Sequence, residues 1–130
     1  TSRRAVRGVA LIEALVGVLI FALGIIGMVG LQVAMTRAQG AAKIRADANN
    51  LGSEVIGIMW ADRANLQKYN GAACESYDPC QEWTDKVAAA LPGGEATLSY
   101  DAATGGVGIE ITWSSPAEGN HRHVLTTSIR

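Results

Sequence analysis

Residues 7–37 of the chain read RGVALIEALVGVLIFALGIIGMVGLQVAMTR, and this apolar stretch decides the fold. Between Ala14 and Thr36 it contains no charged residue. As a helix, that part alone is roughly 35 Å long, which is enough to cross a hydrocarbon layer of about 30 Å. An excess of Lys and Arg marks the cytoplasmic side of a membrane protein, and such residues precede the stretch at Arg3, Arg4 and Arg7. The sequence therefore predicts a short cytoplasmic end, a membrane-spanning helix, and the rest of the chain on the other side.

Two other interpretations of this stretch remain open. A secretory signal peptide has an apolar core of about 7–15 residues followed by a site of small residues. The run here is longer, although Ala38-Gln39-Gly40 offers a weak cleavage site. An ordinary single-span anchor accounts for the length but not for Glu13, the one acid inside the apolar run. An ionisable group costs roughly 2.5–3.5 kcal/mol at the centre of a membrane helix and less near its end, so Glu13 is a candidate functional residue.

The order of residues at the start of the stretch resembles the N-terminus of type IV prepilins and pseudopilins. Basic residues are followed by Gly8 and then by Leu11-Ile12-Glu13 in an unbroken apolar helix. The resemblance implies that a prepilin peptidase cuts after Gly8 on the cytoplasmic face and methylates the new amine of Val9. Residues 1–8 are then a prepilin leader, and residues 9–36 are the transmembrane helix. The first two mature residues depart from the family's usual Phe or Met and its frequent Thr, which leaves the efficiency of methylation open.

Beyond the membrane-spanning part, residues 37–70 are predicted to continue as an amphipathic helix. Apolar residues recur there at three- and four-residue spacing, with charged residues on the other faces; the stripe comprises Ala38, Ala41, Ile44, Ala48, Leu51, Val55 and Ile58. The pattern fades toward the turn dipeptide Asn70-Gly71, so we expect one helix from about Val9 to Gln67. This is far longer than a usual globular helix, and its stripe needs a partner, for which the remaining residues are the candidate.

Residues 71–130 are predicted to form a small globular head. Cys74 and Cys80 would lie on the extracytoplasmic side, where disulfides form. A bridge between them closes a short loop and contributes about 2–2.5 kcal/mol in the chain-entropy relation. Asp78-Pro79 predicts the cap and first turn of a short helix, with Gln81 at the capping-box position.

After this helix, which is predicted to stop at Pro92-Gly93-Gly94, alternating polar and apolar residues predict three strands. These strands cover residues 96–100, 108–113 and 123–129, with a turn over 101–106. Strands joined by tight connections pair in antiparallel fashion. The predicted fold class is therefore α+β: a long N-terminal helix, membrane-spanning in its first half, packed on a small antiparallel sheet.

The predicted elements of the head make the resemblance to pilins more specific. Trp83, the following segment up to Gly94, and the strand containing Trp113 are similar to minor pilins of the PilV type. The resemblance implies a pilin-like fold and a minor pilin that primes and assembles type IV pili with other minor pilins and the major pilin, supporting pilus-dependent motility and adhesion. It implies a place in the inner membrane with the head in the periplasm, and then in the pilus fibre at the cell surface. A minor pseudopilin of a type II secretion system shares the helix pattern, and a generic single-span membrane protein with a periplasmic binding head is a further alternative.

Glu13 has a specific role in this resemblance. After cleavage, the positive amine of Val9 is buried among apolar helices, where an unpaired charge is costly. In the family, the acid at this position pairs with the subunit above it. The resemblance therefore implies that Glu13 acts by charge pairing during assembly, and that this chain sits beneath at least one other subunit.

Other chemistry has little support in the sequence. Without the leader arginines, eight basic residues face twelve acidic ones, a formal charge near −4. No basic patch with interleaved aromatic residues is present, which argues against nucleic acid as a partner. His121 and His123 form a His-x-His pair on one face of a strand, but the sequence places no third ligand, so no metal site is predicted. No serine has a base partner at a catalytic spacing, and we expect neither enzyme activity nor a cofactor.

Overall fold

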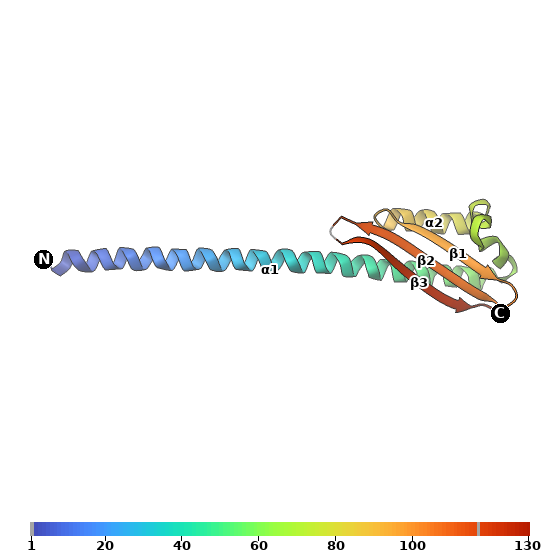
Figure 1. Cartoon of the computed structure of the whole chain (residues 1–130), viewed down its shortest axis with the longest axis horizontal. Coiled ribbons are helices and arrows are strands. Elements are labelled where there is room, and N and C mark those ends of the chain that lie inside the picture. The colour runs from blue at the N-terminus through green and yellow to red at the C-terminus, as the bar shows by residue number, and fades with distance from the viewer. Residues whose placement is uncertain (1, 117) are drawn as a thin grey trace. The chain divides into compact units, whose positions relative to one another are not determined.

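The computed structural model describes residues 2–116 and 118–130, with side chains from Gly8 onward except at position 117. It divides into two compact units, Thr1–Ala41 and Ala42–Arg130, called unit 1 and unit 2 below. The first helix, α1 (Ser2–Ala61), belongs to both units. Every other element lies in unit 2 (Figure 1).

Unit 1 consists of the first part of α1, and its apolar side chains are exposed. Phe21, for example, is 70 % exposed. From Gly8 on, the most apolar stretch of the helix has a mean hydropathy of 2.8, and none of it is buried within the protein. A core helix of a soluble protein would bury such residues, whereas a contiguous exposed apolar surface marks an interaction with a membrane or a partner. The predicted long apolar helix is confirmed, and it is long and apolar enough to cross a membrane.

The helix ends earlier than predicted, at Ala61 instead of near Gln67. Two 3-10 segments follow, η1 (Arg63–Tyr69) and η2 (Gly71–Ser76). At Asp62 the backbone leaves the helical region, with φ −117° and ψ 42°. The Asp62 carboxylate accepts a hydrogen bond from Asn65 Nδ2 at 2.6 Å, a local interaction that competes with helix continuation. The apolar residues Leu66 and Tyr69 of this segment are buried. They lie in the 3-10 segment η1 and not in a continuation of the α-helix.

The second helix, α2 (Asp78–Ala90), forms where the sequence predicts it, but its cap differs. Tyr77 is the N-cap residue and no side chain caps the helix, so the predicted capping by Asp78 with Gln81 is wrong. Asp78 lies inside the first turn together with Pro79. A negative charge there still interacts favourably with the helix dipole. The helix ends at Ala90, and the C-cap residue Leu91 directly precedes the predicted Pro92-Gly93-Gly94 stop.

Three strands form one antiparallel sheet: β1 (Glu95–Asp101), β2 (Gly106–Ser115) and β3 (Gly119–Ser128). Their order is β1-β2-β3, with β2 in the centre (Figure 1). The register pairs Leu98 with Ile109 and Ile109 with Leu125. Each strand is longer than the sequence pattern predicted, and β3 begins at Gly119 because pairing with β2 continues through the histidines to the turn. The predicted α+β fold, a long helix with a small antiparallel sheet, is confirmed.

The core of unit 2 lies between the sheet and the two helices. Period-two positions of β2 supply its centre, and α1 and α2 add residues at three- and four-residue spacing; the main members are Val107, Ile109, Ile111, Trp113, Ala48, Leu51, Val55, Met59, Trp83 and Val87. Trp83 is 2 % exposed and donates its Nε1–H to the backbone oxygen of Leu51 at 2.9 Å. From Ile44 on, the predicted stripe is therefore the face of α1 that packs in this core, whereas Ala38 is exposed.

One glycine of α1, Gly52, lies against a side chain of the sheet. A Cβ at Gly52 would overlap with Cδ1 of Leu125 on β3. Glycine costs up to about 1 kcal/mol relative to Ala inside a helix, and here it leaves room for the end of the Leu125 side chain. The other glycines of α1 from Gly8 on have open space where a Cβ would lie, so close packing inside the chain explains only Gly52.

Candidate processing and assembly site

The residues predicted to act in processing and assembly lie on exposed turns of α1 in unit 1. Val9 is 65 % exposed, and Glu13 is exposed as well. Because one turn contains 3.6 residues, Val9 and Glu13 share a face of the helix one turn apart. The leader arginines Arg3, Arg4 and Arg7 lie outside the residues with described side chains.

Gly8 occupies a position where the chain itself has no need of glycine. A Cβ added there would meet no atom within 4 Å, and alanine is the better helix former by up to about 1 kcal/mol. Folding of this chain therefore gives no reason for glycine at position 8. Any requirement for glycine at this position would have to come from another molecule that binds the backbone there.

Glu13 is an acid on an apolar surface. Val16 and Gly17, the residues three and four positions further along its face, offer no charge. Among the residues with described side chains, none forms an ion pair or hydrogen bond with Glu13. If other apolar helices covered this face, the carboxylate would need a cation to offset the loss of its hydration. The arrangement can therefore neutralise a positive group brought against this face.

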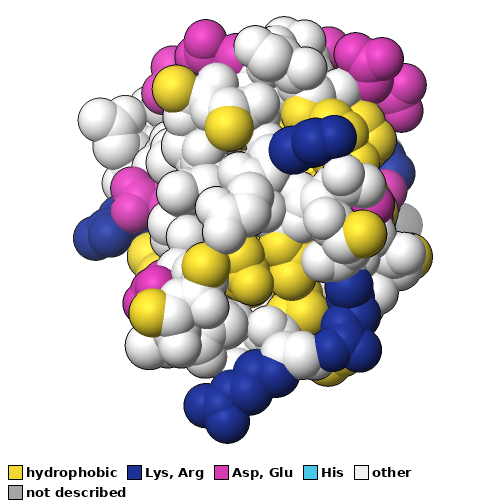
Figure 2. Space-filling view, turned by 90° about the vertical axis from the view of Figure 1, so that its right-hand side faces the viewer, with side chains coloured by type: hydrophobic (Ala, Val, Ile, Leu, Met, Phe, Trp, Pro, Cys, Tyr) yellow, Lys and Arg dark blue, Asp and Glu magenta, His cyan; other side chains and the backbone are white. Residues whose placement is uncertain are grey.

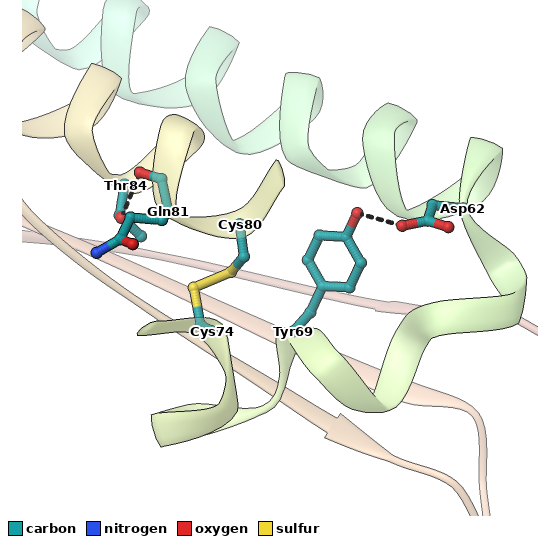
Figure 3. Close-up of a disulfide and its surroundings, with 6 residues drawn as sticks. All are labelled: Asp62, Tyr69, Cys74, Cys80, Gln81 and Thr84. Carbon is teal, nitrogen blue, oxygen red and sulfur yellow. Dashed lines mark hydrogen bonds between the residues drawn. A yellow bond between two sulfur atoms is a disulfide. The ribbon is translucent and has the colours of Figure 1, made fainter. Parts of the chain in front are cut away.

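The disulfide predicted between Cys74 and Cys80 is confirmed, and Figure 3 shows its surroundings. The two Cα atoms are 5.2 Å apart, within the usual range for a disulfide. Cys80 is fully buried and Cys74 is 8 % exposed. The bridge ties η2 to the first turn of α2, so it fixes the segment that leads from the end of α1 into the second helix.

A hydrogen-bonded cluster that the sequence did not reveal lies beside this disulfide. Its centre is the carboxylate of Asp62, directly after α1, which accepts bonds from Asn65 Nδ2, from the Tyr69 hydroxyl at 2.9 Å, and from the Tyr77 hydroxyl. Figure 3 shows the Tyr69 contact. The rings of Tyr69 and Tyr77 meet edge to face with centroids 5.2 Å apart, and Lys68 lies 5.1 Å from the centroid of the Tyr77 ring. The cluster and the disulfide together hold the turn region against the end of α1.

These contacts change how the groups titrate. Hydrogen bonds from Tyr77 and then Asn65 hold the pKa of Asp62 below its usual 3.8. Burial, followed by the bond to Asp62, raises the pKa of Tyr69, and the bond to Asp62 raises that of Tyr77. All three shifts favour an ionised Asp62 that accepts from two neutral phenols. The cluster of Asp62, Asn65, Tyr69 and Tyr77, called the clasp below, therefore joins the end of α1 to the segment that follows it.

Asp62→Asn should destabilise unit 2 by about 1–3 kcal/mol at neutral pH, because the buried Tyr69 hydroxyl loses its charged acceptor. The pKa of Asp62 is lower in the folded chain, so this stabilisation is present above 3.8 and is lost as pH falls through the folded value. The difference between wild type and variant should be smaller at a pH well below 3.8 than at neutral pH. Urea denaturation of the full chain in detergent micelles measures it at both pH values.

The matched control for this experiment is Asp85→Asn, which changes an exposed acid in the middle of α2 that lies outside the cluster. Its effect on the free energy of unfolding should stay within about 0.5 kcal/mol, as for other surface substitutions. An Asp62→Asn effect that was as small as that of the control, or that did not change with pH, would contradict the clasp.

The histidine pair lies on β3, on the face of the sheet that carries the core. His121 stacks on Trp113 with ring centroids 5.6 Å apart, and its Nε2 lies 3.3 Å from the carboxylate of Glu118. The described residues hold no group of three or more His, Cys, Asp or Glu side chains placed to bind a metal ion. The pair is therefore a packed part of the strand.

Charged side chains are mixed on the surface of unit 2. On the face in Figure 2, Lys and Arg side chains are spread among apolar and uncharged atoms, with acidic side chains at its margins. Ion pairs join elements across this surface, Lys86 with Glu54 at 2.6 Å and Arg122 with Glu110 at 2.7 Å. Such exposed pairs contribute little to stability. On the face in Figure 2, positive and negative side chains both occur, so it is not a uniformly charged surface.

No family model, no curated protein sequence and no solved structure matches this chain. The features that bear on function are the exposed Gly8–Val9 and Glu13 turns at the start of an apolar helix, and a disulfide-stapled head built on the other half of that helix.

Proposed function

We propose that this chain is a minor pilin, a membrane-anchored subunit that takes part in priming and assembly of type IV pili. The observation that carries the proposal is the combination on one helix of Gly8–Val9, Glu13 and an exposed apolar stretch, with a small α+β head formed around the helix's second half. Neither an enzyme nor a simple anchor explains this combination. In the proposal, residues 1–8 are the leader, residues 9–36 span the inner membrane, and unit 2 lies in the periplasm.

The exposed apolar part of α1 suits two successive environments. In the membrane its side chains contact lipid tails, and in a fibre they contact the same helices of neighbouring subunits. Because lipid is as apolar as leucine, association of such helices depends on close packing and on polar contacts between them. The small residues of this stretch, Gly17, Gly24, Gly27 and Gly30, allow close approach and have open space around them in the isolated chain. Neighbouring minor and major pilins are the proposed partners.

The residue at which the mature chain begins tests the proposal. Mass spectrometry of the protein from its native cells should find a chain that begins at Val9, and sheared surface fibres should contain it. A chain that begins at Val9 but never leaves the cell envelope would assign it to a secretion pseudopilus instead. An intact N-terminus would mean a generic single-span protein, and a start beyond Gly40 would mean a secreted module; either would overturn the proposal.

Glu13→Gln should leave membrane insertion and cleavage unchanged but reduce incorporation into fibres by about tenfold or more. Removing one partner of a buried charge pair costs roughly 3–5 kcal/mol, and about 1.4 kcal/mol corresponds to tenfold. The measurement is the ratio of chain in sheared fibres to chain in membranes. Glu75→Gln is the matched control, because Glu75 is an exposed acid of the head and its loss should not change the ratio. Normal incorporation of Glu13→Gln would contradict the pairing role.

A further inference from the structure

The loop that the disulfide closes, residues 74–80, contains one residue of the clasp. This residue is Tyr77, whose hydroxyl donates a hydrogen bond to the carboxylate of Asp62, directly after α1. Asp62 and Tyr77 lie 15 positions apart in the sequence. One short loop is therefore both closed on itself by a covalent bond and attached to the end of α1 by a hydrogen bond.

Backbone hydrogen bonds join Tyr77 to both cysteine residues. The N–H of Tyr77 donates to the oxygen of Cys74 at 3.1 Å, and the N–H of Cys80 donates to the oxygen of Tyr77 at 3.0 Å. The N–H of Gln81 donates to the same Tyr77 oxygen at 3.0 Å, and Tyr77 is the N-cap residue of α2. Because its backbone is held from both sides of the loop, a movement of either cysteine away from the other would also move Tyr77.

Burial protects the disulfide from reagents while the loop is closed. Cys80 is fully buried, Cys74 is 8 % exposed, and both belong to the core of unit 2. Thiol–disulfide exchange requires that a thiolate reaches one of the two sulfur atoms. A reductant therefore attacks this bridge only after the loop has opened locally.

Opening of the loop breaks the contact of Tyr77 with Asp62 before it disturbs the rest of the clasp. Tyr77 is half-buried, whereas Tyr69 is fully buried and has its own bond to Asp62 at 2.9 Å. The Tyr77 ring meets the Tyr69 ring only edge to face, and its other close neighbour is the flexible side chain of Lys68. Tyr77 is therefore the member of the clasp that the loop carries with it.

We propose that the disulfide and the clasp together form a redox-sensitive switch. The Tyr77–Asp62 bond keeps the loop closed and so slows reduction of the disulfide, and reduction by a dithiol in turn releases Tyr77 from Asp62. Coupling between two equilibria is reciprocal. The factor by which the closed clasp favours the disulfide is therefore also the factor by which the disulfide favours the closed clasp.

The redox step is ordinary thiol–disulfide exchange. One thiolate of the dithiol attacks a sulfur of the bridge, and the other cysteine sulfur leaves as a thiolate. The second thiol of the reductant then displaces the first cysteine sulfur from the mixed disulfide. In all, the chain gains two electrons and two protons, and the dithiol becomes a cyclic disulfide. The reduced loop has lost its covalent closure, and Tyr77 moves with it.

The test is reduction of the folded full chain in detergent micelles by dithiothreitol, with maleimide labelling of the thiols that form. Tyr77→Phe keeps the ring and removes only the hydroxyl. Its disulfide should be reduced about tenfold faster than that of the wild type, and the ratio of oxidised to reduced chain at equilibrium should fall by a similar factor. Tenfold corresponds to about 1.4 kcal/mol, which is of the order of one hydrogen bond to a charged group. Asp62→Asn removes the charged acceptor instead and should accelerate reduction as well, so the test does not depend on one variant.

Two control variants separate the switch from a general loss of stability. Tyr100→Phe removes a hydroxyl that makes no hydrogen bond within the part of the chain that the structure describes, and it should be reduced at the rate of the wild type. Ile111→Val removes a methyl group from a fully buried residue of β2 outside the loop and the clasp. Its cost in stability is similar to that of a lost hydrogen bond, but it leaves the loop intact and should hardly change the rate.

Equal acceleration by Tyr77→Phe and Ile111→Val would mean that the reductant reaches the bridge by unfolding of all of unit 2, and would overturn the switch. An unchanged rate and ratio in both Tyr77→Phe and Asp62→Asn would overturn it too, because the loop would then open without breaking the clasp. Ring resonances of Tyr77 provide a direct check, since they should shift when the wild type is reduced while those of Tyr100 stay in place. None of these outcomes bears on cleavage after Gly8.

Discussion

Replacing Gly8 with tryptophan should leave the leader attached to essentially all of the protein and strand it in the inner membrane. A peptidase that cuts after position 8 has to fit the backbone closely, and a side chain there would clash with it. The chain itself would accept the change, because a Cβ at Gly8 meets nothing within 4 Å and any other non-proline residue is a better helix former than glycine. The effect on maturation should therefore appear without any effect on folding.

The measurement is the mass of the N-terminal peptide from cell membranes, alongside the circular dichroism of the purified chain. Val9→Phe is the control, because position 9 directly follows the proposed cleavage site and prepilins usually have phenylalanine or methionine there. This variant should be cleaved normally. Normal maturation of Gly8→Trp would remove the main support for the proposed function. A misfolded variant would instead contradict the finding that position 8 has open space.

Trp83→Ala should destabilise unit 2 by about 3–5 kcal/mol, the usual cost of removing a buried tryptophan. Trp83 is 2 % exposed and lies in the core between α1, α2 and the sheet. Its Nε1–H bond to the Leu51 oxygen at 2.9 Å also joins α2 to α1. A domain of this size has a total stability of only about 5–15 kcal/mol, so this change should consume a large part of it. Urea denaturation of the full chain in micelles, followed by circular dichroism, measures the loss.

Trp60→Ala is the matched control, since Trp60 is the same residue type on α1 but is 46 % exposed and contacts the Arg63 side chain. Its removal should cost about 1 kcal/mol or less. Trp83→Phe should fall between the two, because it keeps most of the apolar volume and loses the hydrogen bond. Equal effects of the two alanine variants would show that α2 is not held by this side chain.

Local patterns in the sequence predicted most of the elements. The charge-free stretch up to Thr36 predicted the long apolar helix, since length and polarity alone decide whether a helix can face lipid. Alternation in residues 96–100 and 108–113 predicted two strands because a strand half-buried on one face has a period of two. The pair Cys74 and Cys80 predicted a disulfide from spacing and context. In each case the determining residues are neighbours in the chain.

Two local predictions failed where distant residues competed with a local pattern. The helix stripe appeared to continue past Ala61, but the tyrosine hydroxyls of Tyr69 and Tyr77 converge on Asp62 and favour a turn there. Asp78 has a residue type suited to capping, yet the disulfide and the clasp fix the preceding segment so that Tyr77 takes the cap position. The Tyr77–Asp62 bond and the disulfide form only when the chain folds, so the apolar pattern and the residue type at position 78 alone do not predict either arrangement.

The sequence by itself determined the apolar helix, the exposed Gly8–Val9 and Glu13 turns, the disulfide and the α+β class, because each follows from the polarity or conformational preference of neighbouring residues. Only the tertiary structure decided where α1 ends, that Gly52 lies against the Leu125 side chain, and that Asn70 bonds to the edge of β1. Each feature includes at least one contact between residues far apart in the sequence, such as that of Tyr77 with Asp62, and packing in three dimensions selects among local conformations of nearly equal free energy.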